Sequence, residues 1–253
     1  MATTPGSATG GTAADEQFAP IRILVSNDDG VGADGIDVMV EALRGEPNVT
    51  VVVSAPAANQ SGTGGKTTPG GVEATTTTTK SGYEATSVAG FPADSVNWAL
   101  DHPTGGAPDL VISGINNGQN IGTAVDLSGT IGAARAAALR GIPAVAVSAG
   151  LATAPATPDF DGAAGVVIDW LREHRAAIAA KQVPPSVTSF NEPSCPTGSP
   201  RGLLEVPVAT DLAGRNLLAP SDCTSTVTNP PDDVDAFVNG FTTESAVPLT
   251  PAA

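Results

Sequence analysis

The sequence predicts an α/β protein with a mostly parallel sheet, helices on both faces of that sheet, and an irregular, β-containing C-terminal extension. Two observations carry this prediction. Apolar runs of strand length alternate with segments whose apolar residues recur at helical spacing, which is the pattern of strand–helix–strand units. The composition of the 253 residues, 41% hydrophobic and 15% charged, also permits a sizeable buried core.

The pattern begins with a buried strand at residues 21–26, IRILVS. The next segment is predicted to be a helix ending at Gly45, because its apolar residues recur at helical spacing. Those residues are Ile36, Met39, Val40 and Leu43. Residues 49–56, VTVVVSAP, form the second buried strand, and the Gly- and Thr-rich residues 59–82 predict a loop or an irregular hairpin.

Five further elements follow in the order helix, strand, helix, strand, helix. They cover residues 93–100, 108–114, 128–141, 143–150 and about 160–180. The second of these helices is the clearest, because Ser128 can cap it, alanine dominates it and Gly141 ends it. After about residue 185 the pattern weakens into Pro-rich segments and short strands such as LLEVPVA, which predicts the irregular extension.

Residues 1–20 are small, polar and rich in Gly and Pro, with no basic start and no apolar stretch. They are not a signal peptide as written, and they predict a flexible arm of the kind left when a signal is removed and an initiator Met1 is added. Cys195 and Cys223 are both flanked by turn-forming residues, which favours a loop-closing disulfide in an extracellular or periplasmic protein. The alternative is a pair of free thiols in a cytoplasmic protein.

The formal net charge is −15 at pH 7. A charge of this sign argues against binding to nucleic acid polymers or to anionic membranes, both of which need a basic face. No stretch of the sequence reaches the roughly 20 apolar residues of a membrane span. An anionic substrate would meet an unfavourable long-range field, and a cation bound at the site would be the simplest remedy.

Polar residues follow each of the first three predicted buried strands. They are Asn27, Asp28 and Asp29 after the first strand, Asn59, Gln60, Ser61 and Gly62 after the second, and Asn116 and Asn117 after the third. In open parallel sheets ligands bind beyond the carboxyl ends of the strands, so these residues are expected at one edge. Their side chains offer only hard oxygen ligands, which suit Mg²⁺, Mn²⁺ or Ca²⁺ rather than a structural zinc.

Asp28 and Asp29 are adjacent, and two neighbouring carboxylates repel each other unless a cation or a helix dipole offsets their charge. A divalent cation is one interpretation. The alternative is structural: Asp-Asp-Gly is a common turn, and Ser61 and Asn116 could satisfy loop backbone groups. The occurrence of all these residues at one sheet edge favours the cation.

Ser128, Gly129 and Thr130 stand at the start of the Ala-rich helix, where free N–H groups and the helix dipole attract an anion. A phosphate beside a divalent cation would satisfy both features. An ordinary N-cap with a tight turn is an equal alternative for this segment taken alone.

Five segments occur in collinear order between about residues 21 and 150: ILVSNDDGVGADGI, APAANQSG, GFPADSVNWAL, PDLVISGINNGQNIG and SGTIGAARAAALRGIPAVAVS. In order and spacing they resemble the SurE family of 5′/3′-nucleotidases. The resemblance implies a Rossmann-like domain and a divalent-metal phosphomonoesterase that hydrolyses nucleoside 5′- or 3′-monophosphates to nucleoside and phosphate by metal-activated water. Some members of the family also shorten polyphosphate.

The family's functional residues can be placed on this sequence. The resemblance implies one divalent cation per subunit, Mg²⁺ or Mn²⁺, held by Asp28, Asp29, Ser61 and Asn116. It implies phosphate contacts by Ser128, Gly129 and Thr130, with Asn116 serving both groups. Asp28, Asp29 and Asn116 are the expected catalytic residues, whereas His102 and His174 have no evident role.

The resemblance thins after residue 150. We expect an arm at 1–20 and one SurE-like domain at 21–253, divided into a Rossmann-like core at 21–185 and a C-terminal region at 186–253. Residues 232–250 look like a shortened form of the family's ending, an arm that exchanges between subunits, which implies a homodimer or a higher homo-oligomer. The leader and the cysteines suggest an exported branch.

Two other functions remain open from the sequence. The same sheet could be a non-catalytic nucleotide- or metal-binding module that has lost turnover. It could also be a structural extracellular domain held together by its disulfide, but this would leave the convergence of three polar loops unexplained.

Overall fold

The structure is a computed structural model that describes residues 19–251, so the predicted N-terminal arm lies almost wholly outside the described residues. Its strands are β1 (Ile21–Ser26), β2 (Val49–Pro56), β3 (Ala74–Thr78), β4 (Glu84–Val88), β5 (Leu110–Asn117), β6 (Ala144–Ala149), β7 (Val187–Glu192), β8 (Leu203–Glu205) and β9 (Thr242–Val247). Its helices are α2 (Asp34–Arg44), α3 (Pro92–Asp101), the 3₁₀ helix η1 (Gly122–Asp126), α4 (Gly129–Leu139), α5 (Phe160–Ala179) and α6 (Asp233–Val238).

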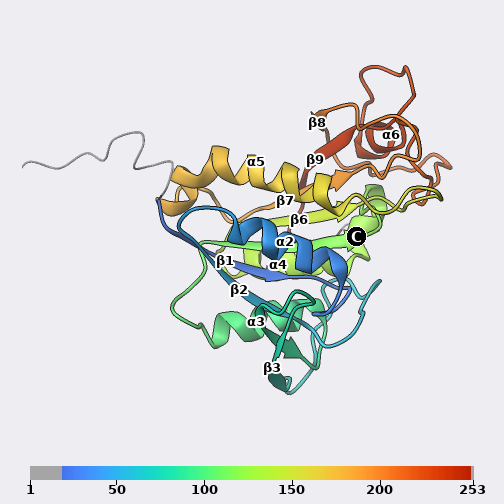
Figure 1. Ribbon diagram of the computed structural model, residues 1–253. Coiled ribbons are helices and arrows are strands. Elements are labelled where there is room, and N and C mark those ends of the chain that lie inside the picture. Colours follow the sequence, from blue (N-terminus) through green and yellow to red (C-terminus); the bar gives the residue numbers. More distant parts are fainter. Residues whose placement is uncertain (1–18, 252–253) are drawn as a thin grey trace, which may run out of the picture.

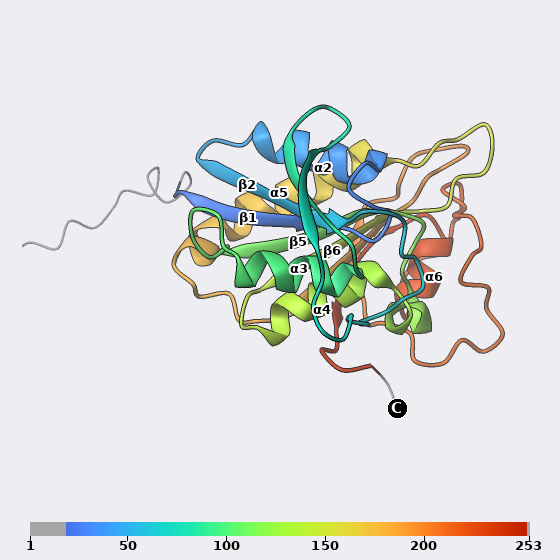
Figure 2. The ribbon, with the colours of Figure 1, turned by 90° about the horizontal axis from the view of Figure 1, so that it is seen from below.

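All nine strands form one sheet in the order β3-β4-β2-β1-β5-β6-β7-β9-β8. The six strands from β4 to β7 pair in parallel, while β3 is antiparallel to β4 and β9 is antiparallel to β7. Helices α2 and α5 cover one face of this sheet, and α3 and α4 cover the other (Figures 1 and 2). The predicted fold class, a mostly parallel α/β sheet with helices on both faces and an irregular C-terminal extension, is confirmed.

The helices bury the faces that the sequence spacing predicts. In α2 the fully buried apolar residues are Ile36, Met39, Val40 and Leu43, which pack against the sheet together with α5. Burial of each such side chain contributes about 1.5–3 kcal/mol relative to exposure. No helix in the described part of the chain combines the length and the apolar character needed to cross a membrane.

The connections of the parallel strands diverge between β1 and β5. From β1 the chain moves through β2 to β4 on one side, and from β5 it moves through β6 to β7 on the other side. Loops that leave the carboxyl ends of two such strands turn in opposite directions and leave a crevice between them. The segments that carry Asp28 and Asn116 therefore lie on the two sides of this crevice.

The C-terminal region contributes more of the sheet than the sequence predicts. Strand β7 pairs in parallel with β6, so the parallel sheet continues past residue 185. Its sequence, VTSFNE, is almost wholly buried although four of its six residues are polar, and its partner β9, TTESAV, also has four polar residues, of which three are buried. Neither strand therefore has an apolar run. Hydrogen bonds satisfy many of the polar side chains that these strands bury.

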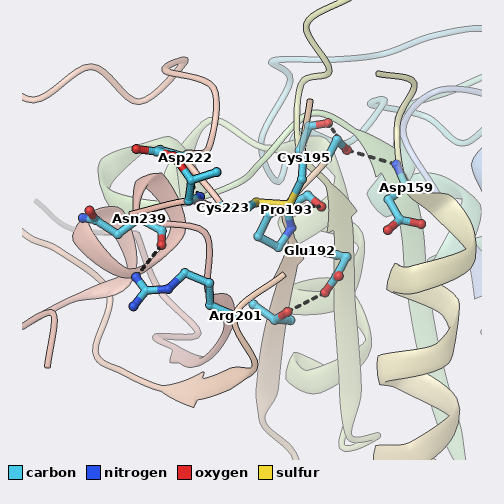
Figure 3. Close-up of a disulfide and its surroundings, with 12 residues drawn as sticks. Asp159, Glu192, Pro193, Cys195, Arg201, Asp222, Cys223 and Asn239 are labelled. Carbon is cyan, nitrogen blue, oxygen red and sulfur yellow. Dashed lines mark hydrogen bonds between the residues drawn. A yellow bond between two sulfur atoms is a disulfide. The ribbon is translucent and has the colours of Figure 1, made fainter. Parts of the chain in front are cut away.

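The predicted disulfide between Cys195 and Cys223 is present, with a Cα–Cα distance of 5.8 Å. It joins the loop after β7 to the segment before α6, beside Glu192 and Asp159 (Figure 3). The crosslink thus fixes the irregular extension to the carboxyl end of the sheet.

Glu192 is a buried carboxyl group close to this crosslink, only 4% exposed. The Thr242 hydroxyl donates to its Oε2 at 2.6 Å. Burial, with a smaller contribution from the charge of Asp159, raises the pKa of Glu192 from 4.5 to about 7 against the opposing effect of the Thr242 hydrogen bond. Ionised Glu192 therefore costs the folded state free energy at neutral and alkaline pH.

The variant Glu192→Gln is expected to be more stable than the wild type at alkaline pH. The folded state holds the Glu192 proton more tightly than the unfolded chain between the two pKa values of 4.5 and about 7, so the unfolding free energy falls as pH rises through that window. Urea unfolding at about pH 8 should show a gain on the order of 1–3 kcal/mol for the variant, and at about pH 4.5 little difference. An equal gain in unfolding free energy at both pH values would show that the gain does not come from the ionisation of Glu192.

Candidate functional site

A tight turn after β1 presents the two adjacent carboxylates. The Asn27 side chain closes this turn, since its Nδ2 donates to the Gly30 carbonyl at 2.9 Å and its Oδ1 accepts from the Gly30 N–H at 3.2 Å. Gly30 has φ +106°, a conformation that favours glycine, and a Cβ there would lie 3.2 Å from the Ala58 backbone of the next loop. The turn therefore holds Asp28 and Asp29 against the loop that follows β2.

Asp28 is 3% exposed and lies against the first turn of α4. The Thr130 hydroxyl donates to its Oδ1 at 2.8 Å. Burial, aided by the charge of Asp29, raises the pKa of Asp28 to about 6, while the Thr130 hydroxyl and backbone N–H partly oppose the shift. The helix dipole thus offsets part of the charge of Asp28, but the net effect of the surroundings still disfavours the ionised form.

Asp29 is less buried and links the other two polar loops. Its Oδ1 accepts from Asn59 Nδ2 at 2.9 Å, and its Oδ2 accepts from the Asn117 N–H at 3.0 Å. Burial raises the pKa of Asp29, and these two hydrogen bonds oppose the shift. The loops after β1 and β2 and the carboxyl end of β5 therefore meet at one carboxylate.

Ser61 lies on the loop after β2. Asn116 is the penultimate residue of β5 itself, because that strand runs to Asn117 rather than ending at the predicted residue 114. The Gln60 N–H donates to the Asp28 carbonyl at 2.7 Å, which holds the loop after β2 against the Asp28 backbone. Ser61, the next residue along this loop, is exposed. Asn116 is 9% exposed, and its Nδ2 donates to the Gly118 carbonyl at 2.6 Å. The amide oxygen of Asn116 is then the atom with the chemistry of a cation ligand.

The three residues at the start of α4 differ in what they offer. Ser128 is the N-cap, and its hydroxyl accepts from the Ile131 N–H at 3.1 Å. Thr130 is fully buried, with its hydroxyl directed to Asp28. The Thr130 hydroxyl and backbone N–H both face Asp28. The Ser128 hydroxyl, which only accepts from Ile131 and keeps its own hydrogen, and the Gly129 N–H are the groups suited to an anion at this helix N-terminus.

One residue that the sequence reasoning missed is Asn120. Its Nδ2 donates to Ser148 Oγ at 2.9 Å and to Thr130 Oγ1 at 3.4 Å. Asn120 therefore contacts the residue that binds Asp28, although it is remote from Asp28 in the chain. Its place four residues after Asn116 in NNGQN gives no sign of this contact.

The site has the donor set of a hard divalent cation. Asp28, Asp29, Ser61 and Asn116 supply carboxylate, hydroxyl and amide oxygens, as Mg²⁺ and Mn²⁺ prefer. Within residues 19–251, neither carboxylate of the pair forms an ion pair with Lys, Arg or His, and no group of three or more His, Cys, Asp or Glu side chains that could hold a metal is found. The buried carboxylate pair fits a cation, and the remaining ligands would be neutral oxygens.

Other prominent features lie away from this site. A cavity of about 760 Å³ is bounded by η1, residues 205–210 and the chain after β9, and contains none of the proposed ligands. His102 and His174 each stack on the tryptophan four residues earlier, at centroid distances of 4.6 and 4.4 Å. His102 caps the end of α3, and His174 lies on α5, so neither contacts the carboxylate pair.

A doubly wound parallel sheet whose switch point carries a carboxylate pair beside a helix N-terminus defines the class of α/β proteins that bind ligands at the carboxyl edge of the sheet. The model of the family described as Survival protein SurE matches residues 23–214. The chain belongs to the SurE family, as the five segments indicated.

Individual relatives agree with this family. The chain is 37% identical over 186 residues to the 5′-nucleotidase SurE of Thermosipho africanus, a match that covers 72% of this chain and 69% of the relative. It is 42% identical over 155 residues to the 5′-nucleotidase SurE of a Synechococcus species, covering 60% of this chain and 56% of that protein. The match to the Xanthomonas axonopodis 5′-nucleotidase SurE is 44% over 128 residues and spans 48% of its length.

The fold comparison extends further along the chain. The crystal structure of the SurE protein from Aquifex aeolicus aligns with a TM-score of 0.69 at 25% sequence identity, covering 91% of this chain and 94% of that one. The matched segment thus spans about half the length of two of the three sequence relatives, whereas the fold match spans nearly the whole Aquifex chain.

Proposed function

We propose that this protein is a divalent-metal-dependent nucleotidase, a phosphomonoesterase that hydrolyses nucleoside 5′- or 3′-monophosphates to nucleoside and phosphate. The observation that carries the proposal is the buried Asp28 carboxylate in contact with the first turn of α4, because it makes the proposed cation ligand the neighbour of the proposed anion-binding helix N-terminus. The relatives named 5′-nucleotidase SurE support the choice of a nucleotide as substrate.

The proposed chemistry assigns a role to each residue. Asp28, Asp29, Ser61 and Asn116 would hold a single Mg²⁺ or Mn²⁺, which when bound supplies Lewis-acid chemistry and an activated water. At the start of α4, the Ser128 hydroxyl and the Gly129 N–H would stabilise negative charge on the phosphoryl oxygens, while Thr130 holds Asp28 and Asn116 would serve both the cation and the phosphate.

The carboxylates of Asp28 and Asp29 differ in their exposure to solvent. Asp29 is more exposed than Asp28, so it is the carboxylate better placed to take the proton from the attacking water. Neither role requires a covalent intermediate.

Phosphate release from 5′-AMP, 3′-AMP and an aryl phosphate tests the proposal. Each substrate is incubated with wild-type protein and Mn²⁺, Mg²⁺ or excess EDTA. Release that depends on the metal and stops with EDTA would support the nucleotidase, and the ratio of the two AMP isomers would define its positional preference. Binding of Mn²⁺ and AMP without release would instead favour the non-catalytic module.

The variant Gly129→Ala is expected to lower kcat/KM roughly 10- to 100-fold, because small displacements of reacting groups are costly. A Cβ at Gly129 would lie 2.8 Å from Asp28 Cβ and 3.0 Å from its Oδ2, so the carboxylate must move. Gly165→Ala on α5 is the matched control, since a Cβ there meets nothing within 4 Å. Equal activity of the two variants would show that Asp28 needs no close contact with α4.

We further propose that the protein is exported and acts as a homodimer or a higher homo-oligomer. The Cys195–Cys223 disulfide is consistent with an oxidising compartment, although it does not define one. Fractionation of the producing cells, with a non-reduced tryptic digest to detect the linked peptides, tests export. Sedimentation equilibrium of the purified protein tests assembly, and a single monomeric species would contradict it.

A further inference from the structure

The Asn120 side chain lies between the C-terminal strands and the carboxylate pair. On one side its Nδ2 contacts Thr130 Oγ1 at 3.4 Å and Ser148 Oγ at 2.9 Å. On the other side its backbone N–H donates to Asn191 Oδ1 at 2.7 Å. Asn120 is 8% exposed and Thr130 fully buried, so water has little access to these contacts.

The direction of these hydrogen bonds follows from the chemistry of the groups. An ionised Asp28 carboxylate can only accept, so the one hydrogen of the Thr130 hydroxyl must be donated to it over their 2.8 Å contact. Any further group that faces Thr130 Oγ1 must then donate. The amide nitrogen of Asn120 meets this requirement, whereas a carboxylate at the same position would compete with Asp28 for the hydroxyl hydrogen.

The backbone around Asn120 is also fixed from the far side. Asn191 on β7 accepts the Asn120 N–H, and its Nδ2 faces both the Asn120 carbonyl and the Thr243 hydroxyl of β9, each at 3.4 Å. These strands belong to the C-terminal part of the sheet. The position of the Asn120 amide is therefore set by strands that supply none of the proposed ligands.

We propose that Asn120 is a positioning residue that directs the Thr130 hydroxyl onto Asp28 and so sets the affinity of the site for its divalent cation. This inference rests on the proposed function, because it assumes that Asp28 binds a cation. Groups that orient a ligand from behind typically change metal affinity 10- to 100-fold when they are removed.

A double-mutant cycle on Mn²⁺ affinity tests the inference without reference to turnover. The dissociation constant of Mn²⁺ is measured by electron paramagnetic resonance for wild type, Asn120→Asp, Thr130→Val and the double variant. Thr130→Ser retains the hydroxyl, and Asn229→Asp makes the same charge change at an exposed turn. Asn120→Ala is measured in the same way and serves in the cycle if Asn120→Asp does not fold, with urea unfolding run on every variant.

The inference predicts that Asn120→Asp weakens Mn²⁺ binding about tenfold, although its extra negative charge would by itself attract the cation. Thr130→Val should weaken binding by a similar factor, and the double variant should bind no more weakly than Thr130→Val alone. Thr130→Ser, which keeps the hydroxyl, should bind Mn²⁺ more tightly than Thr130→Val, and Asn229→Asp should bind as wild type does.

Tighter binding by Asn120→Asp, or additive losses in the cycle, would overturn the positioning role while leaving the metal site intact. If the cycle uses Asn120→Ala instead, the positioning role is overturned by additive losses of Mn²⁺ affinity or by an affinity equal to that of wild type. If wild type binds no Mn²⁺, the proposed function fails and the inference fails with it.

Discussion

The variant Asp28→Asn is expected to lose metal-dependent phosphate release from AMP by at least about 100-fold in kcat/KM. Asparagine keeps the size of the side chain and can still accept the Thr130 hydrogen bond, but it removes the negative charge that would hold the proposed cation. It also removes a buried charge next to Asp29, so the fold should not be weakened. Activity and stability are therefore expected to separate in this variant.

Asp34→Asn is the matched control, because it makes the same chemical change at the exposed start of α2, where Asp34 pairs with Lys80. Phosphate release, Mn²⁺ binding and urea unfolding are measured for both variants. The control should keep wild-type activity, since exposed ion pairs contribute little. Retained activity in Asp28→Asn, with normal dependence on Mn²⁺, would remove Asp28 from the metal site.

Loss of the Cys195–Cys223 disulfide is expected to lower the unfolding free energy by roughly 3–4 kcal/mol, from the entropy of the closed loop in the unfolded chain. The two cysteines are 28 residues apart, and the bond holds a region with little regular structure. The double variant Cys195→Ser/Cys223→Ser and wild type in dithiothreitol should both unfold at lower urea than oxidised wild type.

The serine variant provides its own control, because dithiothreitol should not change its unfolding curve. A further effect is expected in the extension, where Gln119 Nε2 donates to the Leu217 carbonyl at 2.8 Å and Asp233 accepts from the Gly122 N–H at 2.8 Å. Hydrogen exchange of the Gly122 backbone amide, which donates to Asp233, should rise when the crosslink is absent. Identical urea midpoints for oxidised wild type and the serine variant would refute the stabilising role.

The convergence of the polar loops was predictable from the sequence. Asp28 and Asp29 follow an apolar run, and Asn116 follows another, and the carboxyl ends of parallel strands lie at a common edge whatever the remaining contacts are. The structure confirms that the loops meet at Asp29. The roles of these residues in metal and phosphate binding remain proposals that the variants above test.

Strands β7 and β9 were not predictable in the same way. Asn191, Glu192 and Thr243 are buried, yet polar side chains in a Pro-rich region are typical of loops. They can be buried because partners from distant segments satisfy them: Asn191 contacts Asn120, and Thr242 donates to Glu192. Such pairings are between residues remote in the chain, so no local pattern reveals them.

The layered α/β architecture, the sheet edge at which the polar segments gather, and the carboxylates at that edge all follow from the amino-acid sequence alone. These depend on periodicity and strand polarity, which are local properties of the chain. Three facts appear only in the folded protein: Asp28 is buried against α4, the Thr130 hydroxyl is directed to Asp28, and Asn120 contacts this threonine. Those facts depend on burial and on the geometry of hydrogen bonds between segments brought together by folding, which spacing along the chain does not specify.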